Sequence, residues 1–394
     1  MKWKFRFGTV IGNALEYYDI AVFTAISMYL SAELERQGYL QATEMIWGIF
    51  ALRFITRPIG GYIIGRYADR VGKKSALILT SSITGTATLC MAFLPISLLG
   101  IYTPLVILIL QMVLSFSYAG EYPALATYLL HDAKSNEYSR ISALMTGSGL
   151  SGVVISLAVV LLLESTLDLQ IMQTIGWRIP LLLGVVNIAI SFWFRSRLPD
   201  IPIISKEYRK VNWYISFHIF LVVVPGSVAF YTQNLSSSLI REHLNLGDLK
   251  SLYSIVLSSL LLLMIAICSW LTDKYSSAIK VYNVGVLGLI LCSVPLYFMM
   301  ASEVTELILF ALLCIMLITS MVLCNWSYMM AKDANGQVTT LSMGYNLTST
   351  LVGGVTPLII SYLVGLNLIY VGVFLSVCGL TLILSYNLPK PQIA

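Results

Sequence analysis

The sequence predicts an all-α polytopic membrane protein, with twelve transmembrane helices in two six-helix bundles related by pseudo-two-fold symmetry. Three observations support this prediction. Of the 394 residues, 58% are hydrophobic and only 11% are charged, and the mean hydropathy is +0.83. A soluble domain carries roughly 25% charged residues, so no soluble core absorbs this much apolar sequence. A spanning helix needs roughly 20 apolar residues, and the chain therefore has room for about a dozen.

Apolar runs, separated by charged breaks or breaks that contain Pro or Gly, define the individual helices. The first six predicted helices cover residues 8–31, 44–66, 75–95, 102–130, 137–164 and 176–196. Six more cover residues 213–240, 249–272, 278–300, 303–331, 337–364 and 366–388. A polar stretch separates the two sets. We therefore expect an N-terminal bundle over residues 1–197, a cytoplasmic linker over 198–212, and a C-terminal bundle over 213–394.

The basic residues indicate how the helices are oriented. Most of the 24 lysines and arginines fall in loops on the side of the two termini, whereas the opposite loops hold only Arg36, Arg241 and Lys250. Loops rich in Lys and Arg stay on the cytoplasmic side of a membrane. Both termini are therefore predicted to be cytoplasmic, in a cell inner membrane. Because topology explains the net charge of +5, we expect a lipid bilayer around the protein and no nucleic-acid partner.

A faint repeat relates the two halves of the chain. Asp69-Arg70 follows the second predicted helix and Asp273-Lys274 follows the eighth, each at a cytoplasmic helix end. Duplication of a six-helix unit is typical of transporters whose halves rock around a site near the membrane midplane, a mechanism called alternating access. The repeat therefore indicates a secondary transporter of a small polar solute.

Ionisable residues inside the predicted helices are the main functional candidates, because an intramembrane charge is costly unless it faces a cavity or a partner. Glu16 and Asp19 share one face of the first helix, and Arg53 and Arg57 share one face of the second. Counted from the cytoplasmic helix ends, Glu16, Arg57 and Glu121 lie at a common depth of roughly 12–14 Å. Asp19 and Arg53 lie nearer the midplane. We expect the two arginines to be the charge partners of these acids.

Two arginines against three carboxylates leave one carboxylate without a cation. Such a group, in a poorly hydrated cavity, can bind and release a proton near neutral pH. Asp19, Glu16 and Glu121 are therefore candidates for coupling transport to protons, and we expect no cofactor other than protons as the coupling ion. The alternative is that these residues are buried ion pairs that hold the N-terminal helices together.

A solute pocket needs polar groups at mid-depth from both halves, because apolar walls give no orientation. The candidates are Tyr17, Tyr18, Arg53, Tyr118, Tyr122 and Ser148 in the first half, and Gln233, Asn234, Asn325, Tyr328, Tyr345 and Asn346 in the second. For each of them, a hydrogen bond between helices is the alternative role. Guanidinium matches a carboxylate in a bidentate manner. The arginines therefore favour a zwitterion, such as an amino acid or a betaine, or an organic carboxylate. A larger citrate-like chelate is the alternative solute.

Other classes of protein have less support. No nucleophile motif or metal-ligand spacing is present, and His131, His218 and His243 are scattered near helix ends, so we expect neither an enzyme nor a metal site. The six cysteines lie in apolar runs and form no C-x-x-C pair. A proton-independent uniporter or exchanger, and a solute sensor that does not transport, remain as alternatives. We expect the protein to function as a monomer.

Short motifs follow one another along the chain in a characteristic order. They are Gly-Asn-Ala-Leu-Glu-Tyr-Tyr-Asp at 12–19, Arg-Pro-Ile-Gly-Gly at 57–61, Gly-Arg-Tyr-Ala-Asp-Arg-Val-Gly-Lys-Lys at 65–74, Ala-Gly-Glu-Tyr at 119–122 and Gly-Trp-Arg-Ile-Pro at 176–180. In this order the motifs resemble the major facilitator superfamily. Within it they are similar to the metabolite:proton symporter group of proline/betaine, α-ketoglutarate, shikimate and citrate carriers. The resemblance implies proton-coupled import of a small metabolite.

The loop motif at 65–74 matches a superfamily signature and predicts a conformational role for Asp69, Arg70 and Lys73. Asp69 can cap a helix N-terminus across the loop, while the basic side chains meet anionic headgroups. The chain departs from the family pattern in the fourth helix, where Gln111 replaces the usual arginine. It departs again before the eleventh helix, where Gln337 replaces another arginine.

Overall fold

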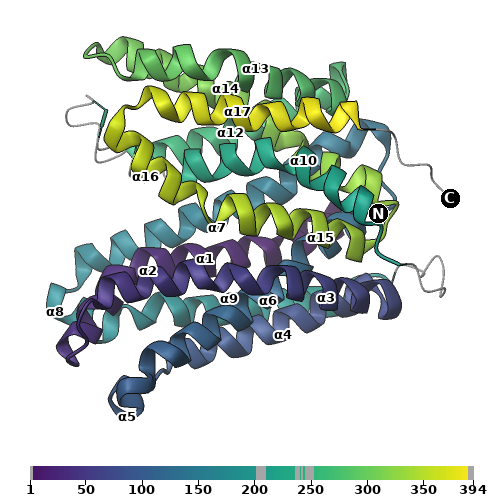
Figure 1. Ribbon diagram of the computed structural model, residues 1–394. Helices are drawn as coiled ribbons and strands as arrows, with labels where there is room; N and C mark the ends of the chain where they lie inside the picture. The colour runs from purple at the N-terminus through teal and green to yellow at the C-terminus, as the bar shows by residue number, and fades with distance from the viewer. Residues whose placement is uncertain (1–2, 201–209, 236–239, 241–242, 245–252, 389–394) are drawn as a thin grey trace. The chain divides into compact units, whose positions relative to one another are not determined.

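The structure, a computed structural model, describes residues 3–200, 210–235, 240, 243–244 and 253–388, without the side chains of 15, 16, 235, 254 and 255. Ten helices in this part of the chain are long and apolar enough to cross a membrane, and they correspond to the third to twelfth predicted helices. They are built from α4 (Lys73–Ala92), α6 (Thr103–Leu130), α7 (Tyr138–Thr166), α9 (Arg178–Ser196), α10 (Trp213–Phe230), α12 (Tyr253–Tyr275), α13 (Ala278–Met300), α14 (Thr305–Ala331), α15 (Val338–Thr348) with α16 (Thr356–Leu366), and α17 (Ile369–Asn387) (Figure 1).

The first two predicted transmembrane helices are helical but are not among these ten. The first is α1 (Trp3–Arg36), and the second consists of α2 (Ala42–Leu52), a 3₁₀ turn η1 (Arg53–Thr56) and α3 (Arg57–Val71). Pro58 lies at the start of α3 and has no N–H group to continue an α-helical hydrogen-bond ladder, which favours a break at this point. The break lies where the sequence places Arg53 and Arg57.

The chain folds into two compact units. The first contains Met1–Tyr128 and Ser148–Tyr208, and the second contains Leu129–Gly147 and Arg209–Ala394. Helix α7 therefore contributes its N-terminal part to the second unit and the remainder to the first. The predicted bundle boundaries at 197 and 213 stay predictions, and most of the predicted linker, residues 201–209, lies outside the described residues.

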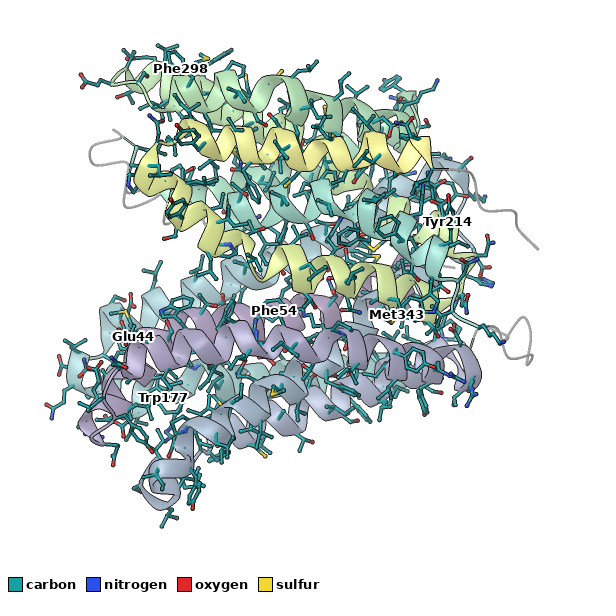
Figure 2. All side chains as sticks on the ribbon, viewed as in Figure 1. Glu44, Phe54, Trp177, Tyr214, Phe298 and Met343 are labelled. Atoms are coloured by element: carbon teal, nitrogen blue, oxygen red, sulfur yellow. The ribbon has the colours of Figure 1, made fainter. Side chains whose placement is uncertain are left out.

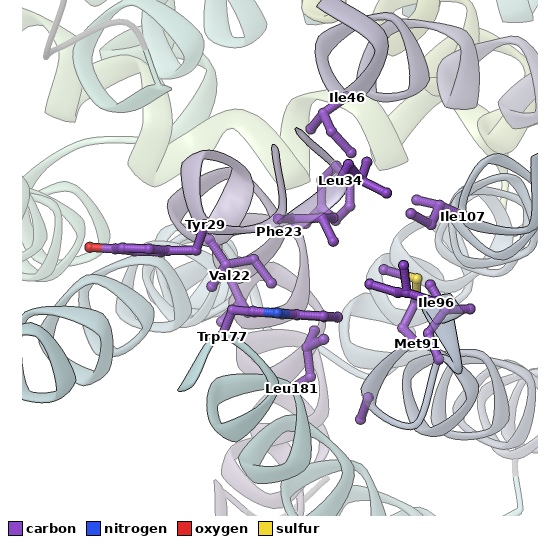
Figure 3. Packing of buried hydrophobic residues seen from close by; sticks show 14 of the residues in the cluster. Val22, Phe23, Tyr29, Leu34, Ile46, Met91, Ile96, Ile107, Trp177 and Leu181 are labelled. Carbon is purple, nitrogen blue, oxygen red and sulfur yellow. The ribbon is translucent and has the colours of Figure 1, made fainter. Parts of the chain in front are cut away.

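Apolar side chains of α1 form much of the core of the first unit. They recur every three or four residues along the helix, as expected for a stripe that faces a core. They are Val22, Phe23, Ile26, Leu30 and Leu34. Figure 3 shows Trp177, which precedes α9 and is fully buried, together with Val22 and Leu181. Helix α1 packs on α2 and α9, and α9 packs on α4. This packing fixes the surroundings of the polar residues that α1 carries.

In the second unit, α13 packs on α14 and α17, and α10 packs on α15 and α17. Two π-helical segments, η5 (Tyr231–Leu235) after α10 and η8 (Ser349–Gly353) after α15, interrupt this regular packing. A Cβ atom at Gly353 would lie 2.7 Å from the Tyr231 ring, so the two segments meet where only glycine fits. Segments of this kind frequently occur at functional sites.

Large apolar side chains face outward on both units. Tyr214 on α10 and Phe298 on α13 are exposed and labelled in Figure 2, and Trp270 and Leu291 are exposed as well. A soluble monomer rarely exposes so many apolar side chains. Contact with lipid explains these side chains, because the interior of a bilayer is apolar. The helices that carry them can lie in lipid, since a helix satisfies its backbone hydrogen bonds internally.

Candidate functional site

Asp19 is a buried carboxylate in the middle of the first unit, with 4% of its surface exposed. The Thr88 hydroxyl on α4 donates to its Oδ2 atom at 2.9 Å, and the Tyr118 hydroxyl on α6 lies 3.5 Å from the same atom. The other oxygen, Oδ1, packs against Gly184 on α9 and receives no hydrogen bond from the part of the chain that the structure describes. Among the described residues, no cation lies within ion-pair distance of Asp19. The site is therefore an acid held by hydroxyl groups.

Two buried guanidinium groups flank the 3₁₀ turn. The Arg53 Nη1 atom donates to Gln111 Oε1 on α6 at 2.9 Å, and its guanidinium lies 4.2 Å from the Phe50 ring centroid. The Phe54 ring, labelled in Figure 2, lies 5.3 Å from the guanidinium of Arg53 and 4.8 Å from that of Arg57. Aromatic faces attract cations, so Phe54 favours both charges. Gln111, where the family usually has arginine, serves here as the acceptor for Arg53.

The expected pairing of Glu121 with Arg53 or Arg57 is wrong. Glu121 on α6 instead forms an ion pair with Arg195 on α9, and both side chains are almost completely buried. Arg195 also donates to Ser81 Oγ at 2.5 Å. Arg195 lies in the last turn of α9, as the predicted helix over 176–196 implies, and this turn packs inside the unit against α4. The side chain of Glu16 lies outside the described residues, and its role stays a prediction.

The remaining first-half candidates fall into different settings. The Tyr18 hydroxyl donates to the Pro180 carbonyl at 2.9 Å, which ties α1 to α9 and indicates a structural role. Tyr17 and Tyr122 form an edge-to-face pair with centroids 6.4 Å apart. Ser148 accepts a hydrogen bond from Asn13 at 2.8 Å. The sequence does not single out Thr88, because a threonine hydroxyl in an apolar helix can also bond to the backbone of its own helix. Asn13 lies in the first motif, but its position there gives no indication of a bond to Ser148 on another helix.

The second unit holds its own polar cluster. Gln233 and Asn234 lie in η5 and contact Tyr297 and Ser258, at 3.5 and 3.4 Å respectively. Asn325 on α14 is fully buried. Its neighbour Trp326 and the ring of Tyr345 on α15 have centroids 6.1 Å apart, which brings α14 and α15 together beside Asn325 and Asn346. Tyr328 does not join this cluster and stacks on Tyr138 with centroids 4.3 Å apart.

The structure describes the contacts of Asp273, in the second half of the repeat, but not those of Asp69, in the first half. Asp273, at the end of α12, accepts hydrogen bonds from the backbone N–H groups of Ser139 and Arg140 at 2.9 and 3.0 Å, and from Arg140 Nε at 3.0 Å. A carboxylate in this position caps the N-terminus of α7. In the first signature, Lys73 donates to the Thr127 carbonyl at 3.3 Å. The capping role of Asp69 and the role of Arg70 stay predictions.

Long apolar helices that surround buried carboxylates and guanidinium groups define a polytopic membrane transporter of small solutes. The chain belongs to the major facilitator superfamily, whose family model matches residues 9–357. The predicted fold of twelve helices in two bundles is confirmed, and so is the expectation that the protein is a transporter and not an enzyme.

Two curated relatives cover nearly the whole chain. A candidate proline/betaine transporter of Staphylococcus haemolyticus (strain JCSC1435) is 25% identical over 381 residues, which are 92% of this chain and 81% of the relative. The shikimate transporter of Escherichia coli (strain K12) is 25% identical over 391 residues, 91% of this chain and 86% of the relative. In fold, the chain is similar to the proton:xylose symporter XylE bound to 6-bromo-6-deoxy-D-glucose, with a TM-score of 0.75, 14% identity, and coverage of 97% of this chain and 94% of that chain.

Proposed function

We propose that this transporter imports a small carboxylate-bearing solute together with protons, by alternating access. The solute is a zwitterion, such as an amino acid or a betaine, or an organic carboxylate. The protein acts as a monomer in the inner membrane, with both termini cytoplasmic. Proline, betaine and shikimate, which the names of the two relatives mention, all carry a carboxylate.

The observation that carries the proposal is the setting of Arg57. Arg57 is 95% buried, and its guanidinium lies 4.8 Å from the Phe54 ring centroid. No carboxylate among the described residues lies within ion-pair distance of it. A buried charge without a counter-ion costs about 3–5 kcal/mol, so a protein rarely keeps one without a function. A carboxylate on the solute supplies the missing negative charge and matches the guanidinium geometry.

Asp19 is the acid that suits proton coupling. Glu121 already has the Arg195 cation beside it, and an opposite charge at close range favours the charged form of a carboxylate. Asp19 has only hydroxyl partners, and a hydroxyl can donate to the charged form or accept from the protonated form.

The proposal is tested in proteoliposomes with an inward proton gradient and radiolabelled proline, glycine betaine and shikimate. We expect accumulation of at least one of these solutes above its equilibrium level, and loss of this accumulation when a protonophore collapses the gradient. Uptake that is indifferent to pH and protonophore would establish a uniporter or exchanger. Absence of counterflow for every carboxylate would instead favour a solute sensor.

A further inference from the structure

The buried asparagines of the polar cluster in the second unit share one arrangement. Each donates its amide N–H to the backbone carbonyl four residues earlier on its own helical segment. The three pairs are Asn234 to Phe230 at 3.0 Å, Asn325 to Met321 at 3.0 Å, and Asn346 to Ser342 at 2.8 Å. A carbonyl oxygen can only accept a hydrogen bond, so the amide nitrogen of each side chain must face it. The three amide oxygens therefore point away from their own backbone.

Two amide oxygens in this cluster receive no hydrogen bond from the described residues, and that of Asn325 is also completely buried. Asn325 is completely buried, and no described group donates to its Oδ1 atom. Gln233 gives its Nε2 proton to the Tyr297 hydroxyl, and no described group donates to its Oε1 atom. Asn234 is different, because the Ser258 hydroxyl donates to its Oδ1 atom at 3.4 Å. A buried acceptor without a donor destabilises a folded protein, and each such group in a native structure calls for an explanation.

We propose that the solute itself supplies these donors, and that the amide oxygens of Gln233 and Asn325 select solutes with N–H or O–H groups. The preferred solute is then a primary or secondary ammonium carboxylate, or a hydroxy carboxylate. A trimethylammonium group has no N–H and leaves both oxygens without a donor. A site built to hydrogen-bond a donor rejects an analogue that lacks it far more strongly than an apolar pocket rejects an extra methyl group. This inference rests on the proposed function, because it assumes a carboxylate-bearing solute.

A methylation series tests the inference with the carboxylate held constant. Glycine, N-methylglycine, N,N-dimethylglycine and trimethylglycine lose their N–H groups one at a time. Proline against N,N-dimethylproline, and lactate against 2-methoxypropionate, repeat the comparison on other frames. Binding is measured on the purified full-length protein by thermal shift, since a ligand that binds the folded state raises Tm. We expect at least one donor-bearing parent to bind at least tenfold more tightly than its fully methylated partner.

Three results overturn the inference. The first is a fully methylated member that binds as tightly as its parent or more tightly. The second is the absence of binding by every donor-bearing member of the series. The third is a rise in Tm from sodium chloride alone, relative to potassium chloride, which would assign the oxygens to a cation. Tight binding and proton-driven uptake of trimethylglycine would remove this inference and leave the proposed function intact. Preferential binding of glycine or proline, together with uptake that does not depend on pH, would support this inference and remove the proposed proton coupling.

The Asn325→Leu substitution separates a binding role from a structural one. It removes the acceptor with little change in volume, so we expect the Tm without solute to be unchanged or higher, and the preference for donor-bearing solutes to fall about tenfold. A lower Tm with an unchanged preference would mean that Asn325 is structural. The matched control is Asn283→Leu on α13, where Oδ1 accepts from the Tyr386 hydroxyl at 3.0 Å, and we expect no change in preference. Gln233→Met gives a second, independent measurement of the same preference, so the test remains available if Asn325→Leu does not fold.

Discussion

Asp19 and Glu121, both buried carboxylates of the first unit, have different surroundings. Glu121 lies against the Arg195 guanidinium, whereas Asp19 has the hydroxyls of Thr88 and Tyr118 and the bare backbone of Gly184 beside it. At the level of single residues, the partner of an acid decides whether it stays charged or exchanges protons. These surroundings are why we propose the coupling role for Asp19, whereas Glu121 pairs with Arg195.

Asp19→Asn tests the coupling role directly. The amide keeps the size of the side chain and its hydrogen bonds but cannot carry the transported proton. We expect loss of proton-driven accumulation and retention of solute exchange, measured as uptake and counterflow in the same proteoliposomes. Glu35→Gln, near the C-terminal end of α1, is the control and should leave both unchanged. Accumulation by Asp19→Asn at the normal level contradicts the assignment.

Arg57→Gln tests the carboxylate site. A hydrogen bond to a charged group contributes about 1.5–3 kcal/mol, so its loss should raise KM for a carboxylate solute by about tenfold or more. Arg57→Lys keeps the charge without the planar fork, and we expect an intermediate KM. Arg36→Gln, which removes an exposed pairing with Glu33, should leave KM unchanged. If the unsubstituted protein and the Arg57→Gln variant have equal KM values for the solute, Arg57 is not part of the solute site.

The Glu121–Arg195 pair makes a prediction about stability. Removing one partner leaves the other as an uncompensated buried charge, at a cost of about 3–5 kcal/mol. Glu121→Gln and Arg195→Gln should therefore each lower Tm clearly, and the double variant should recover much of the loss. Strictly additive losses in this double-mutant cycle would show that the two residues do not depend on each other.

The sequence predicts the buried charges of the first unit but not their partners. Asp19, Arg53 and Glu121 stand out because a charge interrupts an apolar run. Arg195 does not, since it lies at the end of such a run and reads like an ordinary loop cation. Its burial depends on how α9 packs against α4, and 74 residues separate it from Glu121. Local patterns carry no information about such a pairing.

At the scale of the helices, hydropathy predicts the apolar spans well and their irregularities poorly. Pro58 is a local signal for the break before α3. The π-helical segments η5 and η8 have no comparable signal in the sequence, although they lie close enough that a Cβ at Gly353 would meet the Tyr231 ring. The irregular segments carry Arg53 in the first unit and Gln233 in the second. The parts of the helices that matter most for the site are therefore the least predictable.

The cap on α7 is an element-scale feature with its own test. Asp273→Asn keeps the shape of the cap but removes its charge and one of its two acceptor oxygens, and loss of a helix cap typically costs about 1 kcal/mol. A cost of that size opens the first turn of α7 roughly fivefold more often. Hydrogen exchange of the amides at 138–142 should speed up by that factor. Asp333→Asn, near the end of α14, is the control. Unchanged exchange in Asp273→Asn would mean that the cap does not stabilise this turn.

At the scale of the whole molecule, proton coupling requires that solute binding and proton binding influence each other equally. If a proton on Asp19 favours the solute, the solute must favour the proton by the same factor. Adding solute in weakly buffered solution should therefore release no protons and should take up as much as one proton per solute bound. At every pH where solute binding takes up protons, the solute affinity should rise as the pH falls, by at most about tenfold per pH unit. In Asp19→Asn, both the proton uptake and the pH dependence of affinity should disappear, while the affinity itself remains measurable. Proton uptake that persists in Asp19→Asn would move the coupling site to another residue, with Glu16 the next candidate.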